Sequence, residues 1–239
     1  MSPSEFRCKF CVSTFGRTVE SLETRVRKAR QYNPDLIELR LDFIRDLDPN
    51  KLGGIGKFLK GNEILTIRAR QEGGKGSSLS ENERIELIRH AIAQVKPSFI
   101  DIEILTLRKY PVLISEIRMS KTKLVASFHN LKETKDFAYL RNIVLSAPLK
   151  HRSLFAVKIV NRARNIQDNL KVLSLYSRPR QNYASKLVSF CIGPLGIPSR
   201  ILSLFLGSPF GYASLPGEPV ASGQLDIRTM KRIVGMVTL

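Results

Sequence analysis

The fold of this chain can be argued from Leu36-Ile37-Glu38-Leu39-Arg40-Leu41-Asp42, where the odd positions are aliphatic and the last three even positions are charged. Side chains of a β-strand point to opposite faces with a period of two, so one face here is aliphatic and the other charged. The same alternation recurs in Ile100-Asp101-Ile102-Glu103-Ile104. Such strands need an architecture in which both faces find a suitable neighbour.

Strand-like and helix-like segments alternate along the whole chain, as in repeated βα units. Capping patterns at Ser80-Glu81-Asn82-Glu83 and Asp48-Pro49 support two of the helix starts. The predicted strands lie near residues 9–13, 36–42, 64–68, 99–103, 123–128, 155–160, 186–191 and 211–213. The predicted helices cover about 18–32, 48–59, 80–95, 106–120, 132–146, 166–177, 199–206 and 226–237. We therefore predict an α/β fold, a (β/α)8 TIM barrel forming a single domain over residues 1–239.

The charged strand faces locate the predicted active site. Strands joined by helices are expected to be parallel and covered outside by those helices, so their charged faces must point into the barrel. By the same parity, Arg68 shares a face with Thr66, and His129 with Ser127. Catalytic groups of this fold gather where the strands end, at the C-terminal mouth.

Lys158 lies in the middle of Phe155-Ala156-Val157-Lys158-Ile159-Val160, where a charge is expensive to desolvate. A lysine in such a place is either paired or partly neutral, and a neutral amine forms Schiff bases with ketones and aldehydes. The alternative is a lysine on the solvated face of an edge strand. The other ionisable residues predicted to face inward favour the reactive interpretation.

The net charge of +18 raises the possibility of a basic nucleic-acid-binding module. Such a module predicts charge clustered on one face and binding that weakens steeply with salt. The 39 lysines and arginines are instead spread along the chain, and the inward-facing Glu38, His129 and Lys158 would have no purpose. We expect an anionic small molecule as the partner, and no nucleic acid.

Composition also bears on the compartment and on metals. No apolar stretch approaches the roughly 18 residues needed to cross a bilayer, and no signal peptide is recognisable, so we predict a cytoplasmic protein without a membrane partner. Cys8 and Cys11 form a C-x-x-C pattern, but in a strand this offset sends the thiols to opposite faces, and no second Cys/His pair follows. We expect no metal site.

Several motifs carry a resemblance that covers nearly the whole chain, from Val12-Ser13-Thr14-Phe15-Gly16-Arg17-Thr18 to Ala221-Ser222-Gly223-Gln224. The most specific are Glu38-Leu39-Arg40-Leu41-Asp42, Thr66-Ile67-Arg68 with Glu72-Gly73-Gly74, Ser127-Phe128-His129 and Lys158-Ile159. In this order and at successive strand ends, they resemble type I 3-dehydroquinate dehydratase, the Schiff-base lyase of the shikimate pathway that serves aromatic amino acid biosynthesis.

The resemblance implies a mechanism and its catalytic residues. Lys158 would condense with the C3 ketone of 3-dehydroquinate, and the resulting iminium would acidify the C2 proton. His129 matches the general acid/base that removes this proton and then protonates the departing C1 hydroxyl, releasing water and 3-dehydroshikimate. Glu72 matches the carboxylate that orients the histidine. No metal or cofactor is implied, and members of the family are commonly homodimers.

The resemblance also implies substrate-binding residues. Arg200 corresponds to the arginine that clamps the substrate carboxylate. The positions that hold the ring hydroxyls and the carboxylate are matched by Ser13, Glu38, Arg40, Arg68 and Gln224. Cations near Lys158 would destabilise its ammonium form. A class I aldolase is the alternative enzyme, but no glycine-rich phosphate loop follows the seventh or eighth predicted strand.

The last predicted loop departs from the family pattern. Val220 stands where the family usually has a substrate-binding serine, and Ser222 is a candidate replacement. Glycines and prolines crowd the segment 207–224, which ends at Gln224. We expect this segment to be a lid that closes on the substrate.

Overall fold

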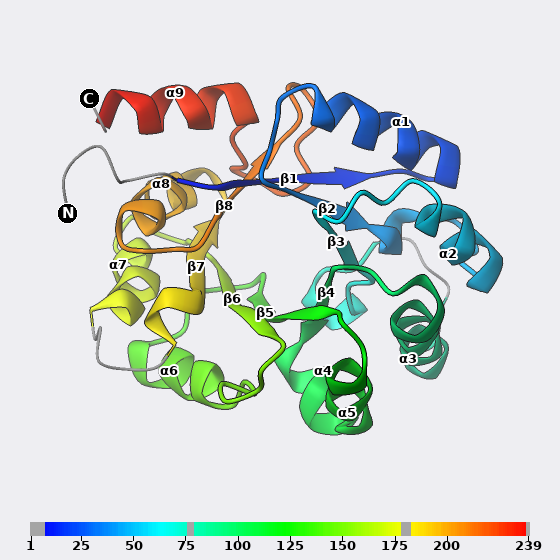
Figure 1. The fold of residues 1–239 in the computed structure, drawn as a ribbon. Coiled ribbons are helices and arrows are strands. Elements are labelled where there is room, and N and C mark those ends of the chain that lie inside the picture. The colour runs from blue at the N-terminus through cyan, green and yellow to red at the C-terminus, as the bar shows by residue number, and fades with distance from the viewer. Residues whose placement is uncertain (1–7, 76–78, 178–182, 238–239) are drawn as a thin grey trace.

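The computed structural model describes residues 8–75, 79–177 and 183–237. Eight parallel strands form one sheet in the order β7-β6-β5-β4-β3-β2-β1-β8, and the intervening helices lie around its outside (Figure 1). The predicted (β/α)8 barrel is thus confirmed. The strands are β1 Phe10–Phe15, β2 Leu36–Arg40, β3 Glu63–Thr66, β4 Phe99–Glu103, β5 Lys123–Asn130, β6 Leu154–Arg162, β7 Leu187–Ile192 and β8 Gly211–Ser214.

The barrel has one seam. Parallel ladders join each neighbouring pair of strands from β8 through β1 to β7, whereas within the described residues no ladder joins β7 to β8. Helix α8 (Ile197–Phe205) contacts both strands from outside, and inside the barrel the rings of Phe190 and Tyr212 have centroids 6.0 Å apart. Side-chain packing therefore bridges the seam that backbone hydrogen bonds leave open.

The helices follow the predicted positions. Thr18 and Ser80 form capping boxes, and the Asp48 carboxylate accepts a hydrogen bond from the backbone N–H of Lys51 at the start of its helix. The remaining helices are α1 Val19–Arg30, α2 Pro49–Gly56, α3 Glu81–His90, α4 Ile104–Lys109, α5 Val112–Met119, α6 Phe137–Leu145, α7 Asp168–Leu173 and α9 Ile227–Val237. Short 3-10 turns are η2 Leu41–Phe43, η3 Arg70–Glu72, η5 Ser174–Tyr176, η6 Ala184–Lys186 and η7 Pro194–Gly196, and η4 Ala91–Val95 is a π-helical continuation of α3.

Several predicted boundaries were wrong. The strand predicted over 64–68 ends at Thr66, and the helix predicted over 132–146 begins at Phe137. The helix predicted over 106–120 is two helices, α4 and α5, separated at Tyr110 and Pro111, because proline lacks an N–H and disfavours helical geometry in the residue before it. The strand predicted over 36–42 ends at Arg40, and Asp42 lies in the 3-10 turn η2. Asp42 accepts both guanidinium hydrogen bonds of Arg40, so the chain turns where this pair forms.

The parity argument holds in the packing. Ile37 and Leu39 belong to the apolar core between the sheet and the helices, whereas Glu38 is buried inside the barrel. Below the charged groups the interior is filled by a second apolar cluster that includes Cys11, Val125, Ala156 and Tyr212. This plug closes the barrel from beneath, so the polar groups form a site with a floor rather than a channel.

The structure bears on two compositional expectations. Within residues 8–75, 79–177 and 183–237, no helix is both long and apolar enough to cross a membrane. Cys8, Cys11 and Cys191 all carry free thiols. The two thiols of the C-x-x-C pattern differ in environment, since Cys11 is buried in the barrel and Cys8 is half-buried.

Candidate active site

The strand ends surround a cavity of about 290 Å³. Its lining includes every predicted site residue, namely Ser13, Glu38, Arg40, Arg68, Glu72, His129, Lys158, Arg200 and Gln224. Residues that the sequence prediction did not assign also line it, among them Lys75, Arg162, Phe190 and Tyr212. The topology thus brings side chains that are up to 211 positions apart in sequence into one enclosure.

Lys158 is 4% exposed, and its ammonium is held by two carboxylates. Nζ donates to Glu38 Oε1 at 3.0 Å and to Asp101 Oδ2 at 3.1 Å. The expectation of cations beside Lys158 was therefore wrong for its direct contacts, since the charged groups hydrogen-bonded to Nζ are anions. Nζ also lies over the Tyr212 ring, 4.3 Å from its centroid.

The two carboxylates are held ionised. Burial by itself would raise the pKa of Glu38, but Lys158 and Arg40 outweigh it and lower that pKa below its usual range. Burial is likewise opposed at Asp101, where Arg68, Lys158 and a hydrogen bond from Ser127 hold the pKa at about 2. Ser13 Oγ donates to Glu38 Oε2 at 2.8 Å, so both Glu38 oxygens are occupied.

Arg68 is the central cation of this network. Its guanidinium contacts Asp101 Oδ1 at 2.9 Å and Glu103 Oε1 at 3.0 Å, and it donates to Ser127 Oγ at 2.6 Å. Glu103 is held on its other side by Arg84 at 3.0 Å. The sequence prediction did not assign Asp101 or Glu103 to the site, although the alternation in residues 100–104 placed both on the inward face.

His129 and Glu72 form a buried pair at the end of β5. Glu72 Oε2 lies 2.9 Å from His129 Nδ1 and accepts the backbone N–H of His129 at 2.7 Å. An oxygen that already accepts one N–H is best placed to accept Nδ1–H as well, which favours the tautomer with its lone pair on Nε2. Burial, Arg68 and Lys158 lower the pKa of His129 well below its usual value, so the imidazole is neutral and able to act as a base.

The seam side of the cavity carries an unpaired cation. Arg200 is 3% exposed, and its guanidinium lies over the Phe190 ring at 4.6 Å. Among the described residues, its Nε and Nη2 have no hydrogen-bond partner. Burial lowers the pKa of Arg200 to about 10, so the side chain remains charged at neutral pH. A buried guanidinium with free donors is a ready site for a carboxylate.

Gln224 closes the loop 215–226 that follows β8, which we call the β8–α9 loop. Its Oε1 accepts the backbone N–H groups of Val220 at 2.9 Å and Ala221 at 3.2 Å, and its Nε2 donates to Ala213 O at 3.0 Å. Val220 and Ser222 both line the cavity. The segment predicted as a lid over 207–224 was too long, because residues 211–214 are the buried strand β8.

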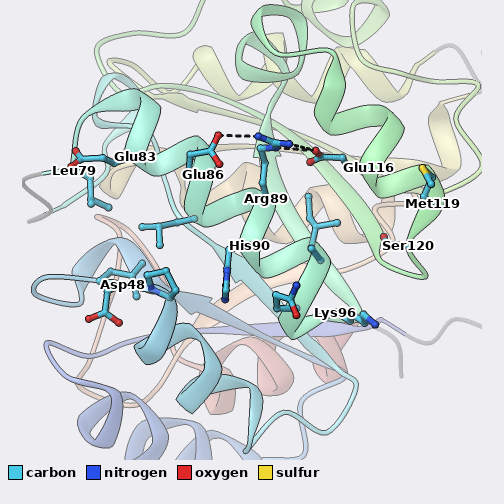
Figure 2. A pocket seen from close by; sticks show the side chains of 16 residues that line it. Asp48, Leu79, Glu83, Glu86, Arg89, His90, Lys96, Glu116, Met119 and Ser120 are labelled. Carbon is cyan, nitrogen blue, oxygen red and sulfur yellow. Dashed lines mark hydrogen bonds and ion pairs between the residues drawn. The ribbon is translucent and has the colours of Figure 1, made fainter.

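A larger groove of about 800 Å³ lies outside the barrel among α2, α3, η4 and α5 (Figure 2). Its central cation is already paired, since Arg89 contacts Glu86 at 3.0 Å and Glu116 at 2.8 Å. None of the predicted site residues lines it. The inner cavity, with its buried lysine and its unpaired arginine, is the better candidate active site.

Comparisons with known proteins identify the family of this chain. The chain matches the family described as Type I 3-dehydroquinase over residues 10–238. It is 34% identical to the 3-dehydroquinate dehydratase of Methanococcus maripaludis strain C6 over 232 residues, which cover 95% of this chain and 99% of that protein. The corresponding protein of Thermococcus gammatolerans is 35% identical over 212 residues, covering 89% and 92%.

Solved structures share the fold. The 3-dehydroquinate dehydratase of Geobacillus kaustophilus superposes with a TM-score of 0.84 at 21% identity, covering 97% of this chain and 91% of that one. The enzyme of Aquifex aeolicus gives a TM-score of 0.74 at 25% identity, covering 94% and 96%. The predicted family and enzyme class are confirmed: this chain belongs to the type I 3-dehydroquinases.

Proposed function

We propose that the protein dehydrates 3-dehydroquinate to 3-dehydroshikimate and water through a Schiff base on Lys158. The observation that carries this proposal is the enclosure of Lys158 Nζ in a small cavity that it shares with the buried His129–Glu72 pair. A ketone bound there can react with the amine while a neutral imidazole removes a proton from the neighbouring carbon.

Arg200 supplies the first binding interaction in this scheme. Its free Nε and Nη2 donors suit the substrate carboxylate, which would neutralise a buried charge that has no partner in the free protein. Ser13, Glu38, Arg40 and Gln224 line the cavity and offer donors and acceptors to the ring hydroxyls. Arg68 is occupied by Asp101, Glu103 and Ser127, so its contribution is to hold the carboxylates in place.

Imine formation balances without an outside reagent. The ammonium passes one proton to a neighbouring group, the amine adds to the C3 carbonyl, and the carbinolamine loses its oxygen as water. The sum is ammonium plus ketone giving iminium plus water. Glu38 and Asp101, both within 3.1 Å of Nζ, are placed to accept and return the proton. The iminium then draws electrons from the adjacent C2–H bond.

His129 completes the elimination. Its neutral imidazole takes the C2 proton and leaves an enamine, and the imidazolium formed gives a proton to the departing C1 hydroxyl, so that water is released. Glu72 accepts a hydrogen bond from Nδ1 and holds the imidazole in the orientation that leaves Nε2 facing the substrate. Water then hydrolyses the product iminium, which returns the Lys158 ammonium and frees 3-dehydroshikimate.

Borohydride trapping tests the proposal directly. Reduction in the presence of 3-dehydroquinate should add a stable mass to the peptide that contains Lys158, and Lys158→Ala should lose both the label and nearly all turnover. Lys75 also lines the cavity and provides the matched control, because Lys75→Ala should keep the label. A label on Lys75, or no dehydration of 3-dehydroquinate by the wild type, would overturn the assignment.

We further propose that the protein is a cytoplasmic homodimer. Three free thiols suit a reducing compartment. Exposed apolar side chains occur on the neighbouring helices α7 and α8 and in the residues that flank them; these are Ile166, Leu170, Leu195, Leu202 and Leu206. Light scattering should give the mass of two 27.0 kDa chains, and Leu170→Glu should give that of one if this face is the interface.

A further inference from the structure

Tyr212 is a buried residue of the cavity for which the proposed chemistry has so far given no use. It projects from β8 into the barrel, it is 4% exposed, and its hydroxyl has no hydrogen-bond partner within the part of the chain that the structure describes. Its ring bridges the seam to Phe190, and Lys158 Nζ lies over it, 4.3 Å from the centroid. The contact with the reacting nitrogen is therefore made by the ring face, not by the hydroxyl.

The hydroxyl does not explain why Tyr212 is there. Burial, reinforced by Glu38 and Cys11, raises the pKa of the phenol well above its usual value, so it stays neutral and is a poor proton donor or acceptor at physiological pH. An unpartnered buried hydroxyl also costs free energy rather than supplying it. What Tyr212 offers the site is an electron-rich ring face next to a cation.

The number of N–H donors on the nitrogen changes during the proposed reaction. The ammonium of Lys158 has three N–H groups and donates to both Glu38 and Asp101. The iminium keeps its positive charge but has a single N–H, so it can donate to only one of these carboxylates. A ring face is not directional in this way, because it attracts the charge wherever the remaining hydrogen points.

We propose that Tyr212 is a catalytic residue whose ring face stabilises the Lys158 iminium by a cation–π contact, at the point where one carboxylate hydrogen bond is lost. The inference rests on the proposed imine chemistry. The iminium has one hydrogen-bonded carboxylate fewer than the ammonium, so its charge is less neutralised and the ring face attracts it more strongly than it attracts the ammonium. Removing the ring should therefore lower kcat more than it raises KM.

Three variants separate the ring face from the hydroxyl and from packing. Tyr212→Phe keeps the face and removes the unpartnered hydroxyl, whereas Tyr212→Leu removes the face. Phe210→Leu is the matched packing control, because Phe210 is fully buried and its ring centroid lies 5.4 Å from that of Tyr212. Each variant is assayed for kcat, for KM and for the fraction of Lys158 trapped by borohydride at saturating 3-dehydroquinate.

Loss of a desolvated cation–π contact predicts a kcat lower by about 5- to 30-fold in Tyr212→Leu, with less imine trapped. Tyr212→Phe and Phe210→Leu should stay within about twofold of the wild type. Equal losses in Tyr212→Leu and Phe210→Leu would overturn the inference in favour of packing, and a matching loss in Tyr212→Phe would assign the effect to the hydroxyl. If Tyr212→Leu does not fold, Tyr212→Met, which is apolar and lacks a ring, replaces it with the same outcomes.

Failure of this inference is distinguishable from failure of the proposed function. A wild type that dehydrates 3-dehydroquinate and is labelled at Lys158 keeps the Schiff-base proposal intact, whatever the Tyr212 variants do. A wild type without that label removes the iminium and, with it, any role of Tyr212 in stabilising one.

Discussion

Arg68 and Arg200 line the same cavity and are each 3% exposed, yet the surroundings of their guanidinium groups differ. Arg68, on the β2–β6 side, contacts Asp101, Glu103 and Ser127 at 3.0 Å or less. Arg200 lies on the seam side between β7 and β8, and its Nε and Nη2 find no hydrogen-bond partner in the described ranges 8–75, 79–177 and 183–237. Their pKa values move in opposite directions, because burial is outweighed by carboxylates at Arg68 and unopposed by them at Arg200.

The two sides of the cavity therefore have different roles. The β2–β6 side is complete in the free protein, so its charges hold the reacting groups in place before any ligand arrives. The seam side is incomplete, and its unpaired guanidinium becomes favourable only when an anion enters. Substrate binding would thus pair the Arg200 guanidinium, which folding leaves unpaired. The unpaired charge lowers the stability of the free protein and increases its affinity for an anion.

The largest effect is expected from a substitution of His129, which lies on the β2–β6 side of the cavity. His129→Ala should lower kcat by about 10²–10⁴-fold, because it removes the group that moves both protons. Borohydride should still label Lys158, since imine formation needs the amine and the carboxylates rather than the imidazole. Near-normal turnover in His129→Ala would make His129 a structural residue, and loss of the label would mean that it acts before the imine.

The two arginines themselves give the next test. Arg68→Met should cost about 3–5 kcal/mol of unfolding free energy, because it leaves Asp101 and Glu103 buried without their main cation. Arg200→Met should leave the unfolding free energy unchanged or raise it, because it removes an unpaired buried charge. Chemical denaturation of both variants measures the contrast.

For substrate binding we expect the opposite order, with the larger effect in Arg200→Met. Loss of the charge-assisted hydrogen bonds to the substrate carboxylate, at about 1.5–3 kcal/mol, predicts that Arg200→Met raises KM by about 10- to 150-fold. The division between the two sides fails if Arg200→Met destabilises the protein as much as Arg68→Met, or if its KM is unchanged.

The sequence predicted the barrel for a physical reason, whereas the set of nine site residues came from the family resemblance. Period-two alternation places a side chain on a face, and in a barrel of parallel strands the charged face has nowhere to go but inward. Glu38, Arg68 and Lys158 followed from this rule together with the family resemblance. Their gathering in one cavity is what the structure adds, while their individual roles remain predictions.

The sequence did not predict which of the inward-facing side chains pair with one another. Parity places Asp101 inside the barrel but does not say that it meets Lys158, because the two are on β4 and β6 and meet across the barrel interior. Likewise, nothing in the alternation of β7 and β8 reveals the missing ladder between them. Phe190 and Tyr212 were overlooked because inward aromatic residues are usually packing, and the signal available was only their inward parity.

Glu72→Gln sharpens the comparison through pH. Burial, aided by Glu103, raises the pKa of Glu72 from 4.5 to about 8, although Arg68 acts in the opposite direction. Between pH 4.5 and pH 8 the folded state therefore binds more protons than the unfolded state, and the unfolding free energy falls as pH rises. The pKa of His129 in the folded state is lowered below its usual value of 6.5. The contribution of His129 to the unfolding free energy therefore rises with pH up to about 6.5, where the unfolded state loses its proton, and is constant above that pH. Between pH 6.5 and 8, Glu72 alone of this pair changes stability.

Denaturation at several pH values measures that window. The unfolding free energy of the wild type should fall from pH 6.5 to 8 by no more than about 1.4 kcal/mol per pH unit, the limit for one proton, and Glu72→Gln should lack this fall. Parallel curves for the two proteins would mean that Glu72 is ionised throughout and that the pair is already charged in the free protein.

The smallest expected effect belongs to the β8–α9 loop, which lies at the seam side and which we predict to act as a lid. Gln224 holds it through the backbone of Val220 and Ala221, and Gly193 N–H donates to Ser222 O at 2.9 Å. If the loop closes on substrate, its amides should exchange faster in the free protein and become protected with substrate or product bound.

Gln224→Ala distinguishes a lid from a fixed wall. A preformed wall predicts equal amide protection with and without ligand, and a loss of binding no larger than one ordinary hydrogen bond, about 0.5–1.5 kcal/mol. A lid predicts a larger loss, since the same substitution releases the two backbone N–H groups that shape the closed loop. Ser222→Ala is the matched control, because its backbone carbonyl still accepts from Gly193 while any hydrogen bond from its side chain to substrate is removed. A loss in Ser222→Ala as large as that in Gln224→Ala would assign the binding energy to a substrate contact in place of loop closure.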